Sequence, residues 1–128
     1  MPSFLDSHIF HTLSAVIIGG VWVFHGLYSK LLDGIPRHRL IVGRILGERI
    51  AGPATKVIGL FEIALGIWVF TGWKPIGCAA VQTLAIVGMN TVEILLAGDL
   101  LISATGMLIL NFGFLLLVWH WALAASTI

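Results

Sequence analysis

Charged residues are scarce in this sequence of 128 residues. Only 10% of the residues are Asp, Glu, Lys or Arg, and 59% are hydrophobic, whereas soluble domains average about 25% charged residues. With a mean hydropathy of +1.05, the chain has too little polar surface to cover a soluble particle of its size. The composition therefore excludes an ordinary soluble domain and predicts a single domain surrounded mostly by lipid.

Cysteine is almost absent, and so is net charge. Cys78 is the only cysteine, which excludes an internal disulfide, a CxxC motif and a cysteine-based zinc site. We interpret Cys78 as a small packing residue in a membrane helix. The formal net charge of +1 provides no basic field to attract phosphates, so we expect no nucleic-acid partner.

Four apolar segments follow one another along the chain. A helix needs roughly 20 mostly apolar residues to cross a bilayer, and the segments cover about residues 9–27, 57–73, 76–96 and 101–124. The first has no Lys or Arg before it and is too long for the core of a signal peptide, so we expect it to remain as a membrane span.

The connections between the later segments are short. The sequences GWKP and AGDL are turns of the kind that join antiparallel neighbouring helices. Strands are not expected, because an open sheet cannot cross a bilayer and the pattern does not alternate as a barrel would. The sequence predicts an all-α integral membrane protein, an up-and-down four-helix bundle.

The first connection, KLLDGIPRHRLIVGRILGERIAGPATK, is longer and basic. It contains six of the seven basic residues: Lys30, Arg37, Arg39, Arg44, Arg49 and Lys56. By the positive-inside rule this loop is cytoplasmic and both termini lie outside. We therefore expect a multi-pass protein of the cell (inner) membrane.

Part of this loop, about residues 36–50, can form a short helix with Pro36 near its start. On a helical wheel one face carries charge: Arg37, Arg44 and Glu48. The opposite face is apolar except for Arg39: Ile35, Val42, Leu46 and Ile50. This pattern is typical of an interfacial helix. It serves either as an anchor that fixes the topology or as a lid over the cytoplasmic mouth of the bundle.

Two carboxylates interrupt the apolar segments, Glu62 and Glu93. A charge at the centre of a spanning helix costs about 2.5–3.5 kcal/mol, so such residues face the bundle interior or a polar cavity. Counting about 1.5 Å per residue from the ends of the spans places His25, Glu62 and Glu93 roughly 8–9 Å deep. Asn90 lies one turn deeper, and Asn111 lies nearer the middle. The sequence predicts one polar site built from several helices.

The spacing of neighbouring residues supports a shared site. Asn90 and Glu93 are three residues apart on one helix, so their side chains point the same way. The same spacing relates Trp22 and His25. Small residues surround them: Gly19, Gly26, Gly59 and Gly66. Such glycines allow either close helix contact or space for a ligand. The structural alternative is that polar residues such as Gln82 and Asn111 simply bond to a neighbouring helix.

Three further histidines are expected at the outer end of the bundle: His8, His11 and His120. His120 lies between Trp119 and Trp121, and tryptophans near helix ends are typical of the interfacial belt. A metal or haem site built from these histidines is a weaker alternative, because no carboxylate or thiol accompanies them. We expect no metal.

Three stretches resemble the DoxX-like family of small four-helix membrane proteins: GVWVFHGLYSKLL, FEIALGIWVFTGW and QTLAIVGMNTVEILLAGDLL. The resemblance covers nearly the whole chain and rests on five residues in order: His25, Lys30, Glu62, Asn90 and Glu93. It implies relatives such as the small subunit of a thiosulfate:quinone oxidoreductase. Where relatives carry intramembrane cysteines, this chain offers only Cys78, so their thiol chemistry is not carried over.

The leading hypothesis is a polar site inside the bundle that binds a small hydrophobic molecule, such as a quinone or an isoprenoid-like lipid. Acid–base chemistry is assigned to three residues: Glu62, Glu93 and His25. Ligand contacts are assigned to five others: Trp22, Asn90, Asn111, Trp68 and Lys30. Whether the site catalyses a reaction is left open.

Other hypotheses assign the bundle a different role. In the first, the bundle is a non-catalytic membrane subunit of a quinone-linked oxidoreductase complex. In the second, it is a proton-coupled exporter of small molecules that uses an intramembrane glutamate. No cofactor is required, although haem ligated by His25 and a bound quinone both stay open. Membrane lipid, an oxidoreductase and further copies of the chain are the partners considered.

Overall fold

The computed structural model describes residues 2–127, and side chains within residues 8–125. All elements in this part of the chain are helical, in agreement with the predicted all-α bundle. In chain order they are α1 (Pro2–Phe24), η1 (His25–Leu31), α2 (Pro36–Leu46), α3 (Glu48–Thr71), α4 (Pro75–Ala97), η2 (Gly98–Leu100) and α5 (Ala104–Thr127).

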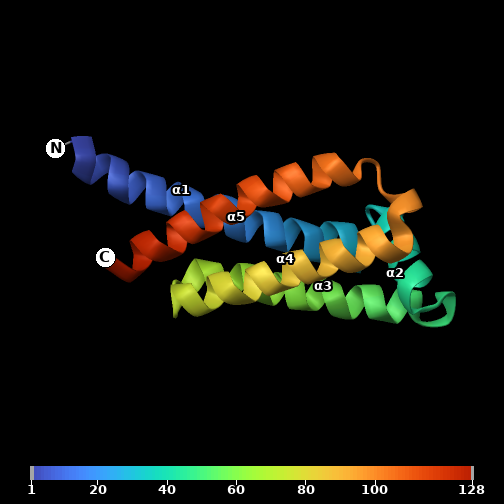
Figure 1. Ribbon diagram of the computed structural model, residues 1–128. Coiled ribbons are helices and arrows are strands. Elements are labelled where there is room, and N and C mark those ends of the chain that lie inside the picture. Colours follow the sequence, from blue (N-terminus) through green and yellow to red (C-terminus); the bar gives the residue numbers. More distant parts are fainter. Residues whose placement is uncertain (1, 128) are drawn as a thin grey trace.

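Four helices are long and apolar enough to cross a membrane. They cover His8–Leu31, Glu48–Thr71, Pro75–Leu100 and Ala104–Ala125. Figure 1 shows them running along one common direction. The α3–α4 turn and the ends of α1 and α5 lie at one end of the bundle, which we call the terminal end. Helix α2 and the α4–α5 connection lie at the other, which we call the α2 end.

The short helix and the second long helix have different bounds from those expected. Helix α2 ends at Leu46 instead of about residue 50, and α3 begins at Glu48 instead of about residue 57. Gly47 separates them with a φ of 103°, a conformation that glycine adopts readily. Glu48 and Ile50 therefore belong to α3, and the helical wheel drawn through residues 36–50 joined two separate helices.

Helix α1 and its continuation η1 approach α3 at paired glycines. A Cβ atom added to Gly59 would lie 2.7 Å from the carbonyl oxygen of Gly26. One added to Gly66 would lie 2.7 Å from the carbonyl oxygen of Gly19. These positions have no room for a side chain, so the glycines serve close backbone contact. The alternative of ligand space beside them does not apply.

The apolar core extends from the middle of the bundle towards the terminal end. Its buried residues are Ile18, Trp22, Leu65, Val69, Cys78, Ala79, Ile86, Val118, Trp121 and Ala122. Trp22 Nε1 donates a hydrogen bond to Gln82 Oε1 over 2.6 Å, which joins α1 to α4. Gln82 thus has the structural role that the sequence left as an alternative.

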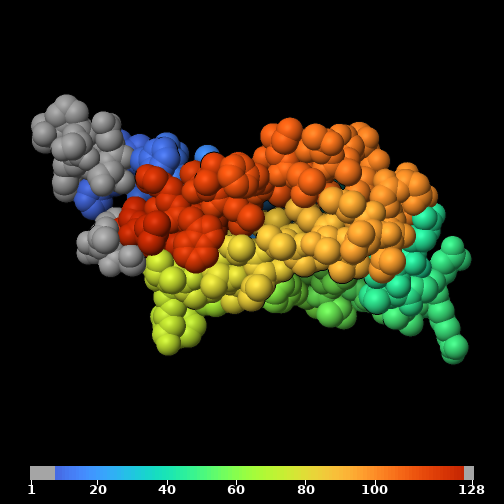
Figure 2. Space-filling view, viewed as in Figure 1, coloured from blue at the N-terminus to red at the C-terminus, as the bar shows by residue number. Residues whose placement is uncertain are grey.

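The outward surface is strongly apolar. Helices α4 and α5 form much of one face in Figure 2, and large side chains on this pair are exposed, including Leu84, Ile109 and Phe112. Water would strongly disfavour so much exposed apolar area. Lipid is the solvent that suits this surface.

Candidate functional site

A cavity of about 540 Å³ lies in the half of the bundle nearer the α2 end. Ligand sites in proteins commonly have volumes of about 300–1,000 Å³. All four long helices and α2 contribute to its wall. Predicted site residues found in this wall are Trp22, His25, Lys30, Glu62, Asn90, Glu93 and Asn111.

A buried ion pair forms part of the wall. Lys30 Nζ lies 2.6 Å from Glu62 Oε1, and the two side chains are only 5% and 4% exposed. Lys30 belongs to η1, a π-helical segment of the kind often found at functional sites. The Gly26–Gly59 contact holds η1 against α3 one turn from Glu62, which brings the ammonium group to the carboxylate.

The α4 side of the cavity presents the second carboxylate. Glu93 is partly exposed and lines the cavity, and among the described side chains no basic group lies within 4.0 Å of it. Asn111 Nδ2 donates a hydrogen bond to Asn90 Oδ1 over 3.0 Å. This bond joins α4 to α5 and is the helix-to-helix role considered for Asn111. The amide pair nevertheless forms part of the cavity wall.

Helix α2 adds residues that were not assigned to the site from the sequence. Arg37, His38 and Ile41 line the cavity, and the rings of His38 and His25 are 5.9 Å apart. Burial, together with Lys30, His25 and Arg37, lowers the pKa of His38 from 6.5 to about 4. Helix α2 therefore covers the α2 end of the cavity, as a lid would. The sequence signal that could have placed these residues in the site is the i, i+4 spacing of Arg37 and Ile41 after Pro36, which puts both on one face of a helix.

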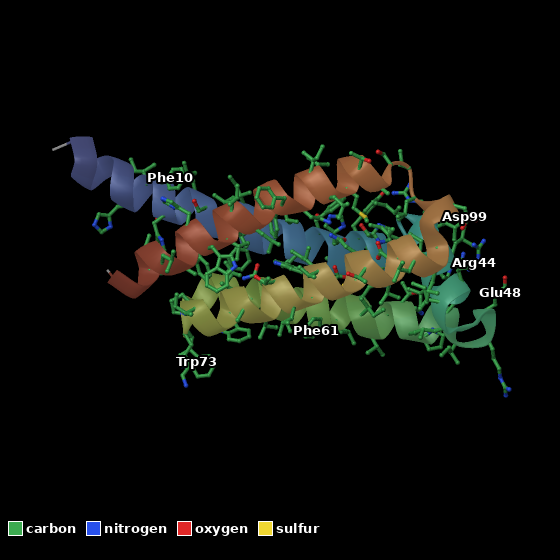
Figure 3. All side chains as sticks on the ribbon, in the orientation of Figure 1. Phe10, Arg44, Glu48, Phe61, Trp73 and Asp99 are labelled. Atoms are coloured by element: carbon green, nitrogen blue, oxygen red, sulfur yellow. The ribbon has the colours of Figure 1, made fainter. Side chains whose placement is uncertain are left out.

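A second ion pair connects α2 to the α4–α5 connection. Arg44 Nη1 lies 2.6 Å from Asp99 Oδ1, and Figure 3 shows the two residues side by side at the α2 end. The contact is exposed to solvent, and its hydrogen bond raises the pKa of Arg44. It links the covering helix to η2 outside the cavity.

Trp68 does not lie in the cavity wall, unlike the other predicted ligand contacts. Its Nε1 donates a hydrogen bond to the Trp73 carbonyl oxygen over 2.5 Å. Trp73 lies at the terminal end, in the α3–α4 turn (Figure 3). Trp68 therefore packs at the end of the bundle opposite to α2, where tryptophan suits a membrane interface.

The outer histidines are likewise separate from the cavity. His11 stacks on Trp121, and His120 meets Phe10 edge-on at a centroid distance of 5.0 Å. Phe10 is labelled towards the terminal end of α1 in Figure 3. His8 is exposed. Within the described residues, no group of three or more His, Cys, Asp or Glu side chains is arranged to hold a metal ion.

The cavity combines groups that can bind and exchange protons. A neutral imidazole has one donor and one acceptor nitrogen, and a carboxylate accepts hydrogen bonds or a proton. His25 and Glu93 are two such groups on one wall. The Lys30 ammonium and the Asn90–Asn111 amides are hydrogen-bonding groups of fixed position. This set suits a molecule with carbonyl or hydroxyl groups.

Comparison with known proteins assigns the chain to a family but not to a particular activity. No curated protein and no solved structure matches it. The model of the DoxX-like family matches residues 19–119, a range that contains every residue of the cavity wall. The family match and the four long apolar helices identify a multi-pass membrane protein. The chain belongs to the DoxX-like family.

Proposed function

We propose that this protein binds a small hydrophobic molecule, a quinone or an isoprenoid-like lipid, in the cavity at the α2 end. The observation that carries the proposal is the Lys30–Glu62 ion pair, which is almost fully buried and yet forms part of the cavity wall. A ligand with hydrogen-bonding groups gives these charges a partner that lipid chains cannot provide.

The energetics of a buried ion pair support a functional role. Removing two charges from water costs several kcal/mol per ion, and well-packed apolar residues often give equal or greater stability. An intramembrane acid is therefore a functional-site candidate by default. Holding the bundle together does not by itself account for Lys30 and Glu62, because the paired glycines already join α1 and α3.

The cavity wall changes character along its length. Apolar residues form the part nearer the middle of the bundle, including Val21, Ile86 and Phe114. Charged and amide groups gather nearer α2. An amphiphile would orient its polar group towards α2 and its apolar part towards the middle of the membrane. Leu110 lines the cavity and is 75% exposed, so the ligand can enter sideways from lipid.

Acid–base chemistry on the bound molecule is the second part of the proposal. His25 and Glu93 are assigned to proton exchange with a ligand oxygen, because both line the cavity and neither forms an ion pair among the described side chains. Proton transfer by a positioned side chain typically contributes 10²–10⁴-fold to a rate. Lys30 and Glu62 then hold the ligand and orient it.

The test replaces both carboxylates by amides of the same shape. Glu62→Gln and Glu93→Gln, singly and together, are expected to weaken binding of a short-tailed quinone probe by tenfold or more, about 1.4 kcal/mol. Mass spectrometry of lipids that copurify with wild-type protein gives an independent measurement. Asp99→Asn is the matched control, because Asp99 lies outside the cavity wall. Unchanged binding in the folded double variant would refute the proposal.

A further inference from the structure

A second, smaller hollow lies beside the cavity. Its volume is about 220 Å³, and it opens between α2, α3 and α4. The residues that line both spaces are Lys30, His38, Ile41, Met89 and Glu93. The two spaces are therefore adjacent and share the same ammonium, imidazole and carboxylate groups in their walls.

Away from this junction the smaller hollow is apolar. The rest of its wall is formed by Val42, Ile45, Leu46, Ile58, Gly88 and Val92. The larger cavity also becomes apolar away from the junction, towards Val21 and Phe114. Polar groups thus stand between two apolar spaces that lead in different directions, one towards α5 and one beneath α2.

From this arrangement we infer the class of ligand, on the basis of the function proposed above: an amphiphile whose hydrogen-bonding group lies between two apolar parts. The longer part occupies the 540 Å³ cavity and the shorter part occupies the 220 Å³ hollow. A lipid with its polar group at the very end of the chain would fill only one space. The other would then lose the dispersion contacts that an apolar group makes with its wall.

Gly88 offers a direct way to fill the smaller hollow. It lines that space, and a Cβ atom added to it would meet no other atom within 4 Å. A leucine at this position can therefore extend into the hollow without a clash at its Cβ. Gly113 of α5 has equally open surroundings and lines neither space. Gly113→Leu is thus a matched control for an added apolar side chain.

The experiment compares two isomeric long-chain alcohols, one with the hydroxyl group at the chain end and one with it inside the chain. Gly88→Leu is expected to weaken binding of the internal alcohol by about tenfold, which corresponds to losing the burial of roughly two methylene groups. Binding of the terminal alcohol should stay unchanged. Gly113→Leu should leave both affinities as in the wild type.

Photocrosslinking to the wild type gives a second readout that requires no variant. An internal alcohol with a photoreactive group on its shorter arm should label Ile58 or Val92. Two outcomes would overturn the two-part ligand while leaving the proposed function intact. One is labelling of only Leu110 or Phe114; the other is an equal loss of affinity for both alcohols in Gly88→Leu. Absence of labelling in either space, with no binding of either alcohol, would count against both.

Discussion

At the scale of single residues, Lys30 and Glu62 show how a membrane bundle can retain charge. Their side chains lie 2.6 Å apart, and the paired glycines of α1 and α3 bring their backbones together. Each charge compensates the other, so neither requires water. We therefore expect the stability of the protein to fall when one partner is replaced and to fall less when both are replaced by apolar residues.

Lys30→Met is expected to destabilise the protein by roughly 3–5 kcal/mol, because it leaves the Glu62 carboxylate buried without its partner. The double variant Lys30→Met, Glu62→Leu should regain most of that stability, since it buries no charge at this position. Unfolding in mixed micelles measures both effects. If the double variant is less stable than Lys30→Met alone, the pair contributes more than mutual compensation.

Residue positions were predictable where depth in the membrane could be counted. The end of each span provides a reference for counting along the helix. Counting from these ends placed four residues at similar depth, and all four line one cavity: His25, Glu62, Asn90 and Glu93. Trp68 was assigned from its aromatic character, and its place near the α3–α4 turn puts it at the opposite end. Arg37 and His38 belong to α2, which lies in the connection between two spans, where depth counting gives no information.

At the scale of helices, the bundle depends on two kinds of contact. Helices α1 and α3 meet through glycine backbones, whereas α4 and α5 are joined by the Asn90–Asn111 hydrogen bond. The apolar runs of the sequence predicted the long helices. They did not predict where α3 begins, because its first turns are polar and the break at Gly47 depends on a backbone conformation.

Gly59→Ala should weaken the contact between η1 and α3 and destabilise the protein by about 1–3 kcal/mol, the usual range for overpacking. The added methyl group would lie 2.7 Å from the Gly26 carbonyl oxygen, and backbone cannot move aside as a flexible side chain can. Gly20→Ala is the control, because its Cβ would meet nothing within 4 Å. Equal stability of the two variants, measured by thermal unfolding in detergent, would contradict the close contact.

Helix α2 should respond to pH through His38. The charged groups and imidazoles around it are Lys30, Arg37, His25 and Glu93. Because the pKa of His38 in the folded protein is lowered from 6.5 to about 4, protonation favours conformations in which α2 leaves the cavity. The packing of α2 against the cavity is therefore most stable above about pH 6.5, and this stability is lost as the pH falls towards 4.

Spin labels introduced at Arg39→Cys on α2 and Leu95→Cys on α4 would report this movement. We expect the distance between the labels to increase or broaden as the pH falls from 7 towards 4, and His38→Phe to remove most of the change. Cys78 has no exposed surface and should not take up label. The same pH response in His38→Phe would assign the movement to another group.

At the scale of the whole molecule, charge and apolar surface are arranged along the length of the bundle. The α2 end contains Arg37, Arg39 and Arg44, whereas Lys74 lies at the terminal end beside Trp73. Between these ends the surface is apolar, with exposed Leu84 and Ile109. From the positive-inside rule we propose one orientation, with the basic end in the cytoplasm and the termini outside.

Labelling with a membrane-impermeant maleimide tests this orientation in sealed vesicles. Arg39→Cys on α2 should react in inside-out vesicles and stay protected in right-side-out vesicles if the basic end faces the cytoplasm, as the positive-inside rule predicts. Lys74→Cys, at the opposite end, should give the reverse pattern. Native Cys78 is fully buried and should contribute little background. If Arg39→Cys and Lys74→Cys react from the same side, the two ends do not lie across a membrane from each other. If both patterns are inverted, the cavity faces the outside, and its ligand would enter from the outer leaflet instead of the cytoplasmic one.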